Sequence, residues 1–207
     1  MWVRAVGSAG TDDLTALVGS RICHDLISPL GAICNGLELM QMSGMADSPE
    51  MALIAESVDS ANARIRFFRI AYGTADRTQM VKSGELQAAL RSSFQARQLQ
   101  INWTTRDMPR NEAKLAFLVL QCLESALPFG GRVSVSEKDY GMAFRASAER
   151  VAADVQLWDR LINMQTSGDL RPAQVQFGLL AELAQFDGWS LDVTTGDGAI
   201  EVVAKRT

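Results

Sequence analysis

The clearest repeat of apolar and polar positions lies between residues 51 and 72. Apolar side chains recur there at alternating intervals of three and four residues, the spacing of a helix that buries one stripe in a bundle. This stripe consists of Met51, Ile54, Val58, Ala61, Ile65, Phe68 and Tyr72. Because Ser48 is a favourable N-cap and Pro49 suits a first turn, we predict a helix from about residue 49 to residue 72 or 74, with Gly73 as its stop.

A matching stripe precedes this helix. Residues 11 to about 41 have the same periodicity, and their stripe consists of Ile22, Leu26, Leu30, Ile33, Leu37 and Met40. The turn MSGMADSP joins the two segments, so residues 11–74 are expected to form an antiparallel helical hairpin. Two helices alone bury too little surface for a stable core, and we therefore expect two copies of the chain to pair into a four-helix bundle.

The pattern changes after the polar segment ADRTQMVKSG, residues 75–84. We expect helices at residues 84–97, 110–127, 154–164 and 172–187, and strands at residues 99–105, 131–137, 141–147, 189–194 and 199–204. The chain is thus predicted to be an α+β protein of two domains. Residues 1–79 form the hairpin domain, and residues 80–207 form an α/β sandwich with helices on one face of a mostly antiparallel sheet.

Composition excludes several kinds of partner. The 207 residues include 20 Lys or Arg and 24 Asp or Glu, a net charge of −4, which is unfavourable for binding nucleic acid. No apolar run approaches the roughly 18 to 20 residues that span a bilayer. The three cysteines, Cys23, Cys34 and Cys122, contain no C-x-x-C pair and indicate free thiols. We therefore expect a cytoplasmic protein that binds neither nucleic acid nor membrane.

The chain has one histidine, His24, which excludes zinc sites built on two or three histidines. At 100° per residue, Ser28, Gly31 and Asn35 lie within about 40° of His24, opposite the apolar stripe. His24 is therefore expected to face outward on a polar surface of small residues. A solvated surface histidine is the plain alternative, but Pro29 costs the helix about 3 kcal/mol, so some local compensation is expected beside His24.

The segment HDLISPL, residues 24–30, resembles the H-box of sensor histidine kinases, which lies on the first helix of a dimeric four-helix bundle. The longer string RICHDLISPLGAICNGLELM is similar to the ChpT-type histidine phosphotransferases of alphaproteobacteria. This resemblance implies a homodimer in which His24 takes a phosphoryl group from an aspartate of one response-regulator receiver domain and passes it to another. An imidazole nitrogen suits this task, because it is nucleophilic near neutral pH and its phosphoramidate is labile.

The resemblance also implies the partners and the metal. A hybrid kinase would be the phosphodonor and response regulators would be the phosphoacceptors. The receiver partner would supply Mg²⁺, and this chain would bind no metal and no cofactor of its own.

The candidate catalytic residues are His24, Asp25 and Ser28. Asp25 can orient the imidazole, although adjacent helical side chains point about 100° apart. Ser28 can hydrogen-bond the ring, a phosphoryl oxygen or a water, or it can bond back to the preceding turn. Gly31 either permits close approach of a partner or is a packing gap, and Asn35 either meets a receiver domain or is solvated.

Arginines near the histidine are further candidates for partner binding, because receiver domains gather acidic residues around their phosphorylated aspartate. The full partner-binding set is Arg21, Gly31, Asn35, Arg64, Arg66 and Arg69. The alternative for the last three is that the helix dipole favours surface arginines near a helix C-terminus. Met40, Met42 and Met45 form either an adaptable docking surface or packing at the end of the bundle.

A kinase would need a nucleotide site in the second domain. The stretch LVLQCLESALPFGGRVSV resembles the N-box region of kinase ATP-binding domains, but its two asparagines correspond to Gln121 and Ser125 and its lysine to Pro128. Glycine-rich nucleotide motifs are missing, and Gly178 stands alone before the late helix. We expect a degenerate ATPase-like scaffold in a phosphorelay intermediate. The alternatives are an active histidine kinase and a noncatalytic dimerisation or adaptor module.

Overall fold

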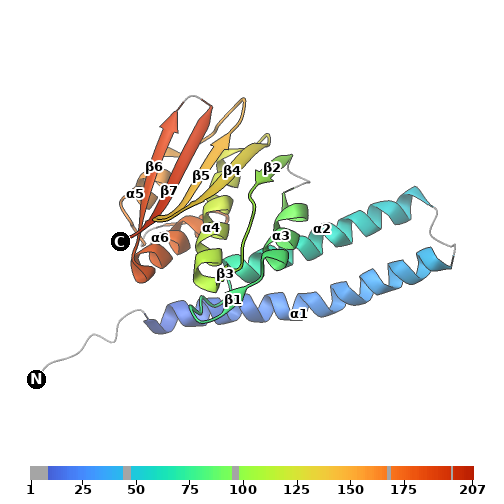
Figure 1. Cartoon of the computed structure of the whole chain (residues 1–207). Coiled ribbons are helices and arrows are strands. Elements are labelled where there is room, and N and C mark those ends of the chain that lie inside the picture. The colour runs from blue at the N-terminus through green and yellow to red at the C-terminus, as the bar shows by residue number, and fades with distance from the viewer. Residues whose placement is uncertain (1–8, 44–47, 95–97, 167–168, 197) are drawn as a thin grey trace, which may run out of the picture.

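The computed structural model describes residues 9–43, 48–94, 98–166, 169–196 and 198–207. Helix α1 (Ala9–Met42) and helix α2 (Pro49–Ala71) form the predicted hairpin. Figure 1 shows that one end of this hairpin projects well past the rest of the molecule. Met45, in the predicted turn between the helices, lies outside the described residues.

Local sequence explains the bounds of α2. Ser48 is its N-cap, because the Ser48 hydroxyl accepts a hydrogen bond from the Met51 N–H at 3.2 Å, and Pro49 is its first residue. After the helix, an added Cβ at Gly73 would clash with the carbonyl oxygen of Arg69, so only glycine fits there. Both the start and the stop predicted for this helix are confirmed.

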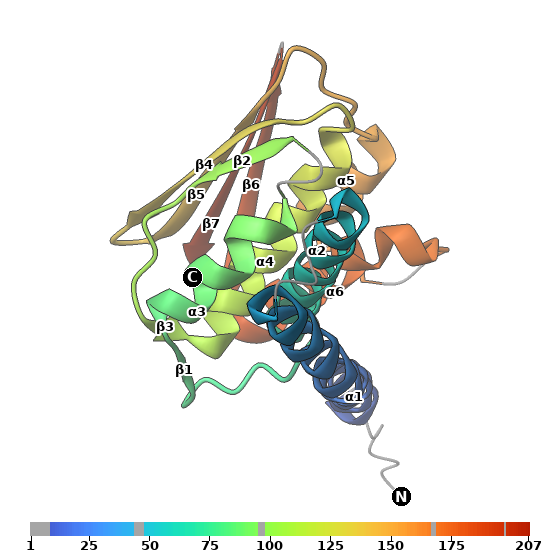
Figure 2. The same cartoon turned by 90° about the vertical axis from the view of Figure 1, so that its right-hand side faces the viewer.

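The rest of the described chain builds a five-stranded sheet with helices on one face (Figures 1 and 2). The strands are β2 (Leu99–Asn102), β4 (Gly131–Lys138), β5 (Gly141–Ser147), β6 (Trp189–Gly196) and β7 (Ala199–Arg206). The helices are α3 (Ser83–Ser93), α4 (Arg110–Ala126), α5 (Val155–Ile162) and α6 (Val175–Asp187), the last preceded by a 3₁₀ turn, Pro172–Gln174. The order is β2-β4-β5-β7-β6, and β2 is parallel to β4 while the other pairs are antiparallel. The predicted α+β architecture is confirmed.

Two short strands were not predicted. Strand β1 (Met80–Val81) pairs antiparallel with β3 (Met108–Pro109), and β1 lies inside the segment predicted as a polar linker. Strands of two residues contain no alternation that a sequence pattern can reveal. Two elements also end earlier than predicted: α3 at Ser93, with residues 95–97 outside the described part, and β2 at Asn102.

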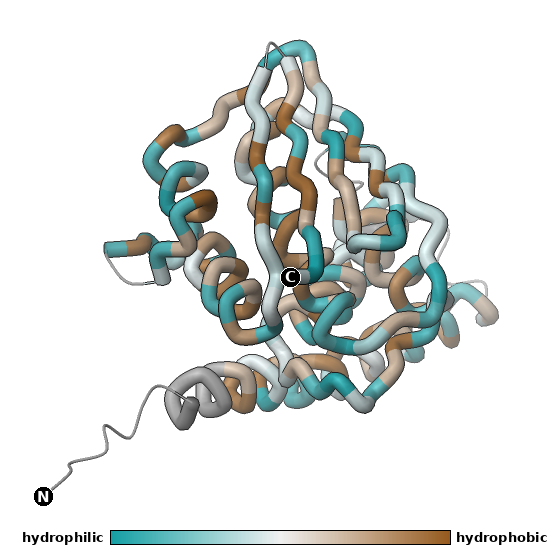
Figure 3. The backbone as a smooth tube through the Cα atoms, turned by 60° about the vertical axis from the view of Figure 1, so that its left-hand side comes forward, coloured by the Kyte–Doolittle hydropathy of each residue, from teal (hydrophilic) through white to brown (hydrophobic). Residues whose placement is uncertain are grey.

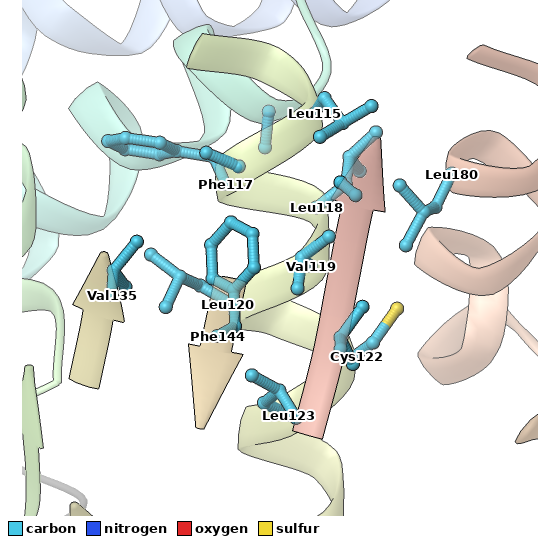
Figure 4. Close-up of a cluster of buried hydrophobic side chains, with 14 of the residues drawn as sticks. Leu115, Phe117, Leu118, Val119, Leu120, Cys122, Leu123, Val135, Phe144 and Leu180 are labelled. Carbon is cyan, nitrogen blue, oxygen red and sulfur yellow. The ribbon is translucent and has the colours of Figure 1, made fainter. Parts of the chain in front are cut away.

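Helix α4 forms the centre of the core. It packs on the sheet beside α6 and against α2, and its apolar side chains point in several directions at once, as expected for a helix buried on most sides (Figure 4). Phe144 of β5 and Leu180 of α6 lie around it and are fully buried. Along the strands hydrophobic and hydrophilic residues alternate, so one face of the sheet meets the helices and the other meets solvent (Figure 3).

Helix α2 buries a face that the periodicity did not indicate. Its buried residues are Ala63, Ile65, Phe67, Ile70 and Ala71, of which Ile65 alone belongs to the predicted stripe. The Phe67 ring centroid lies 4.8 Å from that of Phe117 on α4. The prediction of a single buried stripe was therefore incomplete, because α2 packs on the α/β part of the chain as well as on α1.

The predicted stripes of the hairpin remain partly open to solvent. Leu26 and Ile33 on α1 are 45% and 46% exposed, and Ile54 on α2 is 46% exposed. Within the described ranges, no helix combines the length and the apolar character needed to cross a membrane.

Polar side chains on one side of α4 bind the C-terminal part of α2 and the residues after it. We call them the α4 polar stripe: Arg110, Lys114, Gln121 and Glu124. Lys114 Nζ donates to the Gly73 carbonyl at 2.8 Å, and the Tyr72 hydroxyl donates to Gln121 Oε1 at 2.7 Å. Spacings of four, seven and three residues place this stripe along one helix face, so α4 holds the C-terminal part of α2.

Candidate functional site

His24 lies on the outward side of α1, where 83% of its side chain is exposed. Its neighbour Cys23 points inward and is 5% exposed, and this burial raises the pKa of the Cys23 thiol. The imidazole is therefore accessible to a macromolecule, whereas the adjacent thiol is packed inside and unreactive.

Asp25 contacts the imidazole from the side. Its Oδ1 lies 3.2 Å from His24 Nδ1, and its Oδ2 accepts a hydrogen bond from Arg21 Nε at 2.8 Å. These two bonds, the one to His24 first, lower the pKa of the Asp25 carboxyl. When Nδ1 carries the ring proton it donates to this carboxylate, and Nε2 then keeps a lone pair open to solvent.

The polar face around His24 is open. Ser28 and Asn35 are both exposed, and within the described residues neither side chain forms a hydrogen bond, to His24 or to the backbone. A Cβ added at Gly31 would meet nothing within 4 Å, so neighbouring side chains do not require glycine at this position. The structure therefore places these three residues on one accessible face but does not join them to the imidazole.

The arginines of α2 differ in what they contact. Arg64 is 21% exposed and binds both carboxylate oxygens of Glu124, at 3.2 and 3.1 Å. Arg69 pairs with Glu85 at 2.5 Å. Arg66 is exposed and has no hydrogen bond or ion pair within the described part of the chain. Arg64 and Arg69 thus serve contacts inside the chain, and the guanidinium of Arg66 is open to a partner.

The sequence patterns missed two of these contacts. Glu124 is a carboxylate with 4% side-chain exposure inside an apolar helix, a conflict that signals a buried ion pair. Arg21 and Asp25 are four residues apart, the spacing of neighbours on a helix surface, and this spacing predicts their contact.

Comparison with known proteins places the chain in a family. Residues 83–199 match the protein family described as Histidine phosphotransferase C-terminal domain. The protein phosphotransferase ChpT of Brucella abortus (strain 2308) is 41% identical over 126 residues. The chain belongs to the ChpT-type histidine phosphotransferases. The alignment with the Brucella protein spans 59% of this chain and 60% of that protein.

Solved structures extend the comparison over the whole phosphotransferase chain. A bacterial phosphotransferase superposes with a TM-score of 0.65 and 30% identity, covering 99% of this chain and 100% of that chain. The histidine kinase domain of a blue-light activated kinase from Erythrobacter litoralis gives a TM-score of 0.47 and 13% identity over 89% of this chain and 94% of that chain.

Gln121 and Ser125, the two positions that the sequence resemblance compared with N-box asparagines, make hydrogen bonds within the chain. Gln121 accepts the hydrogen bond from Tyr72, and Ser125 Oγ donates to the Cys122 carbonyl at 2.6 Å. A Cβ added at Gly178 would lie 2.8 Å from Leu170 Cδ1, so a larger residue there would displace the end of the Leu170 side chain. Within the described ranges, no three His, Cys, Asp or Glu side chains are grouped to hold a metal ion.

Proposed function

We propose that this phosphotransferase relays a phosphoryl group between the receiver domains of response regulators as a phosphohistidine on Nε2 of His24. The observation that carries the proposal is the state of the one imidazole in the chain. It is 83% exposed, its Nδ1 lies against Asp25, and its Nε2 is the nitrogen left for attack.

The proposed chemistry consists of two phosphoryl transfers, one from a receiver aspartate to His24 and one from His24 to an acceptor aspartate. The Nε2 lone pair attacks the phosphorus of a receiver aspartyl phosphate, an N–P bond forms, the O–P bond breaks and the receiver carboxylate leaves as an anion. The ring then carries a positive charge, and Asp25 stabilises it through Nδ1–H. In the second half, a carboxylate of the acceptor receiver attacks the phosphorus and the N–P bond breaks.

The receiver partner supplies the rest of the site in this proposal. A Mg²⁺ ion held by the receiver would neutralise charge on the phosphoryl oxygens, and the acidic surface of the receiver would face the open polar side of α1. Gly31 allows close approach there, Ser28 and Asn35 offer hydrogen bonds, and Arg66 offers a free positive charge. A hybrid kinase is the proposed phosphodonor, and response regulators are the acceptors.

The proposal includes no ATP-dependent step. Support comes from Gln121 and Ser125, which make hydrogen bonds to Tyr72 and to the backbone where a kinase would present asparagines to magnesium and phosphate. The α/β domain then acts as a scaffold that holds α2.

We propose that two copies pair through the hairpin. Support comes from the half-exposed apolar stripes, on which Leu26, Ile33 and Ile54 are each about half exposed although their spacing is that of a bundle seam. A four-helix bundle would cover these side chains and leave both copies of His24 outward.

Phosphotransfer from a purified, radiolabelled receiver domain tests the relay. Mixing should label this chain with acid-labile, base-stable phosphate, because phosphoramidates hydrolyse in acid. His24→Ala should remove the label while the circular dichroism spectrum stays that of the parent, since the side chain is exposed. Equal labelling of parent and variant would contradict the assignment.

Incubation with labelled ATP provides the matched control. The chain should stay unlabelled in the presence of Mg²⁺, and labelling would establish a kinase instead. A chain that accepts label from neither ATP nor any receiver domain, yet dimerises, would be an adaptor module.

A further inference from the structure

The Asp25 carboxylate is shared by two side chains of the same helix. Oδ1 lies 3.2 Å from His24 Nδ1, and Oδ2 accepts from Arg21 Nε at 2.8 Å. Each oxygen has a separate partner, so the two contacts together determine the orientation of the carboxylate plane. Among the described residues, Asp25 is the hydrogen-bond partner of His24, and no second side chain binds the ring.

Helix stability does not account for the Arg21–Asp25 pair. Both side chains are largely in solvent, 76% and 50% exposed, and exposed ion pairs contribute about 0.2 to 1 kcal/mol. The basic residue also precedes the acidic one, which is the weaker order for a pair four residues apart. The main effect of the Arg21–Asp25 pair is therefore on the orientation of the Asp25 carboxylate.

Asp25 needs a second contact to stay on the ring. It follows His24 directly, and successive helical side chains diverge by about 100°, so only part of its rotamer range brings the carboxylate to Nδ1. Arg21 lies one turn earlier on the same side as Asp25 and holds the other oxygen. A carboxylate held in this way accepts a hydrogen bond from Nδ1–H continuously and fixes the ring tautomer.

We propose that Arg21 is a positioning residue that acts on His24 through Asp25. By holding Oδ2 it keeps Oδ1 on Nδ1–H, and Nε2 remains the nitrogen with the free lone pair. This assignment replaces partner contact as the role of Arg21. Its meaning for catalysis rests on the proposed relay, whereas its effect on the imidazole tautomer is a property of this chain alone.

Nitrogen-15 NMR of the 207-residue chain tests the tautomer directly. Because the chain has one histidine, its two ring nitrogens are the sole imidazole signals. In the parent at neutral pH, the Nδ1–H tautomer should predominate. Arg21→Met, which removes the donor and keeps a long side chain, should shift the population toward Nε2–H, and Arg21→Lys should restore part of it. The matched control is Arg145→Met, an exposed arginine on the sheet.

Transfer kinetics from a phosphorylated receiver domain test the route through Asp25. Arg21→Met should lower the maximal transfer rate about twofold to fivefold, the range of one exposed charged hydrogen bond, with KM for the receiver unchanged. In an Asp25→Ala background, Arg21→Met should have no further effect, because the side chain through which it acts is gone.

Three outcomes would overturn the proposal. The first is a tautomer ratio that Arg21→Met does not change. The second is an equal loss of rate in both backgrounds. The third is an effect confined to KM, which would make Arg21 a contact for the receiver. If instead no variant accepts phosphate while the tautomer still shifts, the relay fails and the positioning role of Arg21 stands.

Discussion

The ionisation of the Asp25 carboxyl determines how the charge at the candidate site depends on pH. Its pKa is lowered because the ionised form accepts hydrogen bonds from His24 and Arg21. A carboxyl whose pKa is depressed in the folded chain stabilises the fold above its ordinary pKa, and that contribution is lost as the pH falls through the depressed value. Asp25 is therefore ionised throughout the neutral range and available to accept a hydrogen bond from Nδ1–H.

Removing either donor should raise the pKa of Asp25 toward the ordinary value. The rise should be larger for His24→Ala than for Arg21→Met, because the hydrogen bond to His24 is the larger cause. Carbon-13 NMR titration of the Asp25 carboxyl between about pH 2 and pH 6 measures this. The opposite order of the two variants would show that Arg21 dominates the carboxylate.

At the scale of elements, the ion pair between Arg64 of α2 and Glu124 of α4 fastens the hairpin to the α/β part. Arg64 also donates to the Ser93 carbonyl and lies over the Phe68 ring, 5.0 Å from its centroid. Because the Glu124 side chain is 4% exposed, removing Arg64 would take the paired guanidinium from a buried carboxylate. Removing one member of the pair should therefore destabilise the fold more than replacing both members with apolar residues.

Arg64→Ala should destabilise the chain by about 3 kcal/mol, since the Glu124 charge is then buried without its guanidinium. The double variant Arg64→Met with Glu124→Leu should recover much of this loss, because no charge remains to be buried. Urea unfolding of both variants measures the free energies. A double variant less stable than Arg64→Ala would contradict this account.

Residue patterns predicted some of these elements and not others for physical reasons. The bounds of α2 depend on neighbours such as Ser48 and Gly73, so a local pattern contains them. The second buried face of α2 depends on α4, and Arg64 finds its partner 60 residues away, so periodicity on α2 cannot reveal either.

The candidate site shows the same division. The prediction of His24 rested on a motif and on a helix face, both local, and the structure places its side chain outward. The contact of Arg21 with Asp25 is also local and follows from spacing. Arg69 of α2 binds Glu85 of α3, and Gln121 of α4 binds Tyr72 at the end of α2. Because each partner belongs to another element, the sequence pattern of the helix itself does not predict the contact.

At the scale of the whole molecule, the half-exposed apolar stripe of the hairpin predicts a dimer. A single charged substitution in this stripe should prevent dimerisation. Ile33→Glu should shift the chain to a monomer, because the carboxylate would be buried at the seam of the proposed bundle. Light scattering measures the mass. Ala32→Glu, which adds the same charge at an exposed position well off the stripe, should leave the mass of the parent. A dimer that survives Ile33→Glu would place the interface elsewhere.

The α4 polar stripe holds α2, whereas α1 packs mainly on α2 and carries the histidine. Substitutions on the outward face of α1, as at other exposed sites, alter the free energy of unfolding by about 0.5 kcal/mol or less. Evolution can therefore exchange Ser28 or Asn35 without endangering the fold. If the proposed relay holds, substitutions on α1 can alter which receiver domain binds, while the contacts between α2 and the α/β part stay as they are.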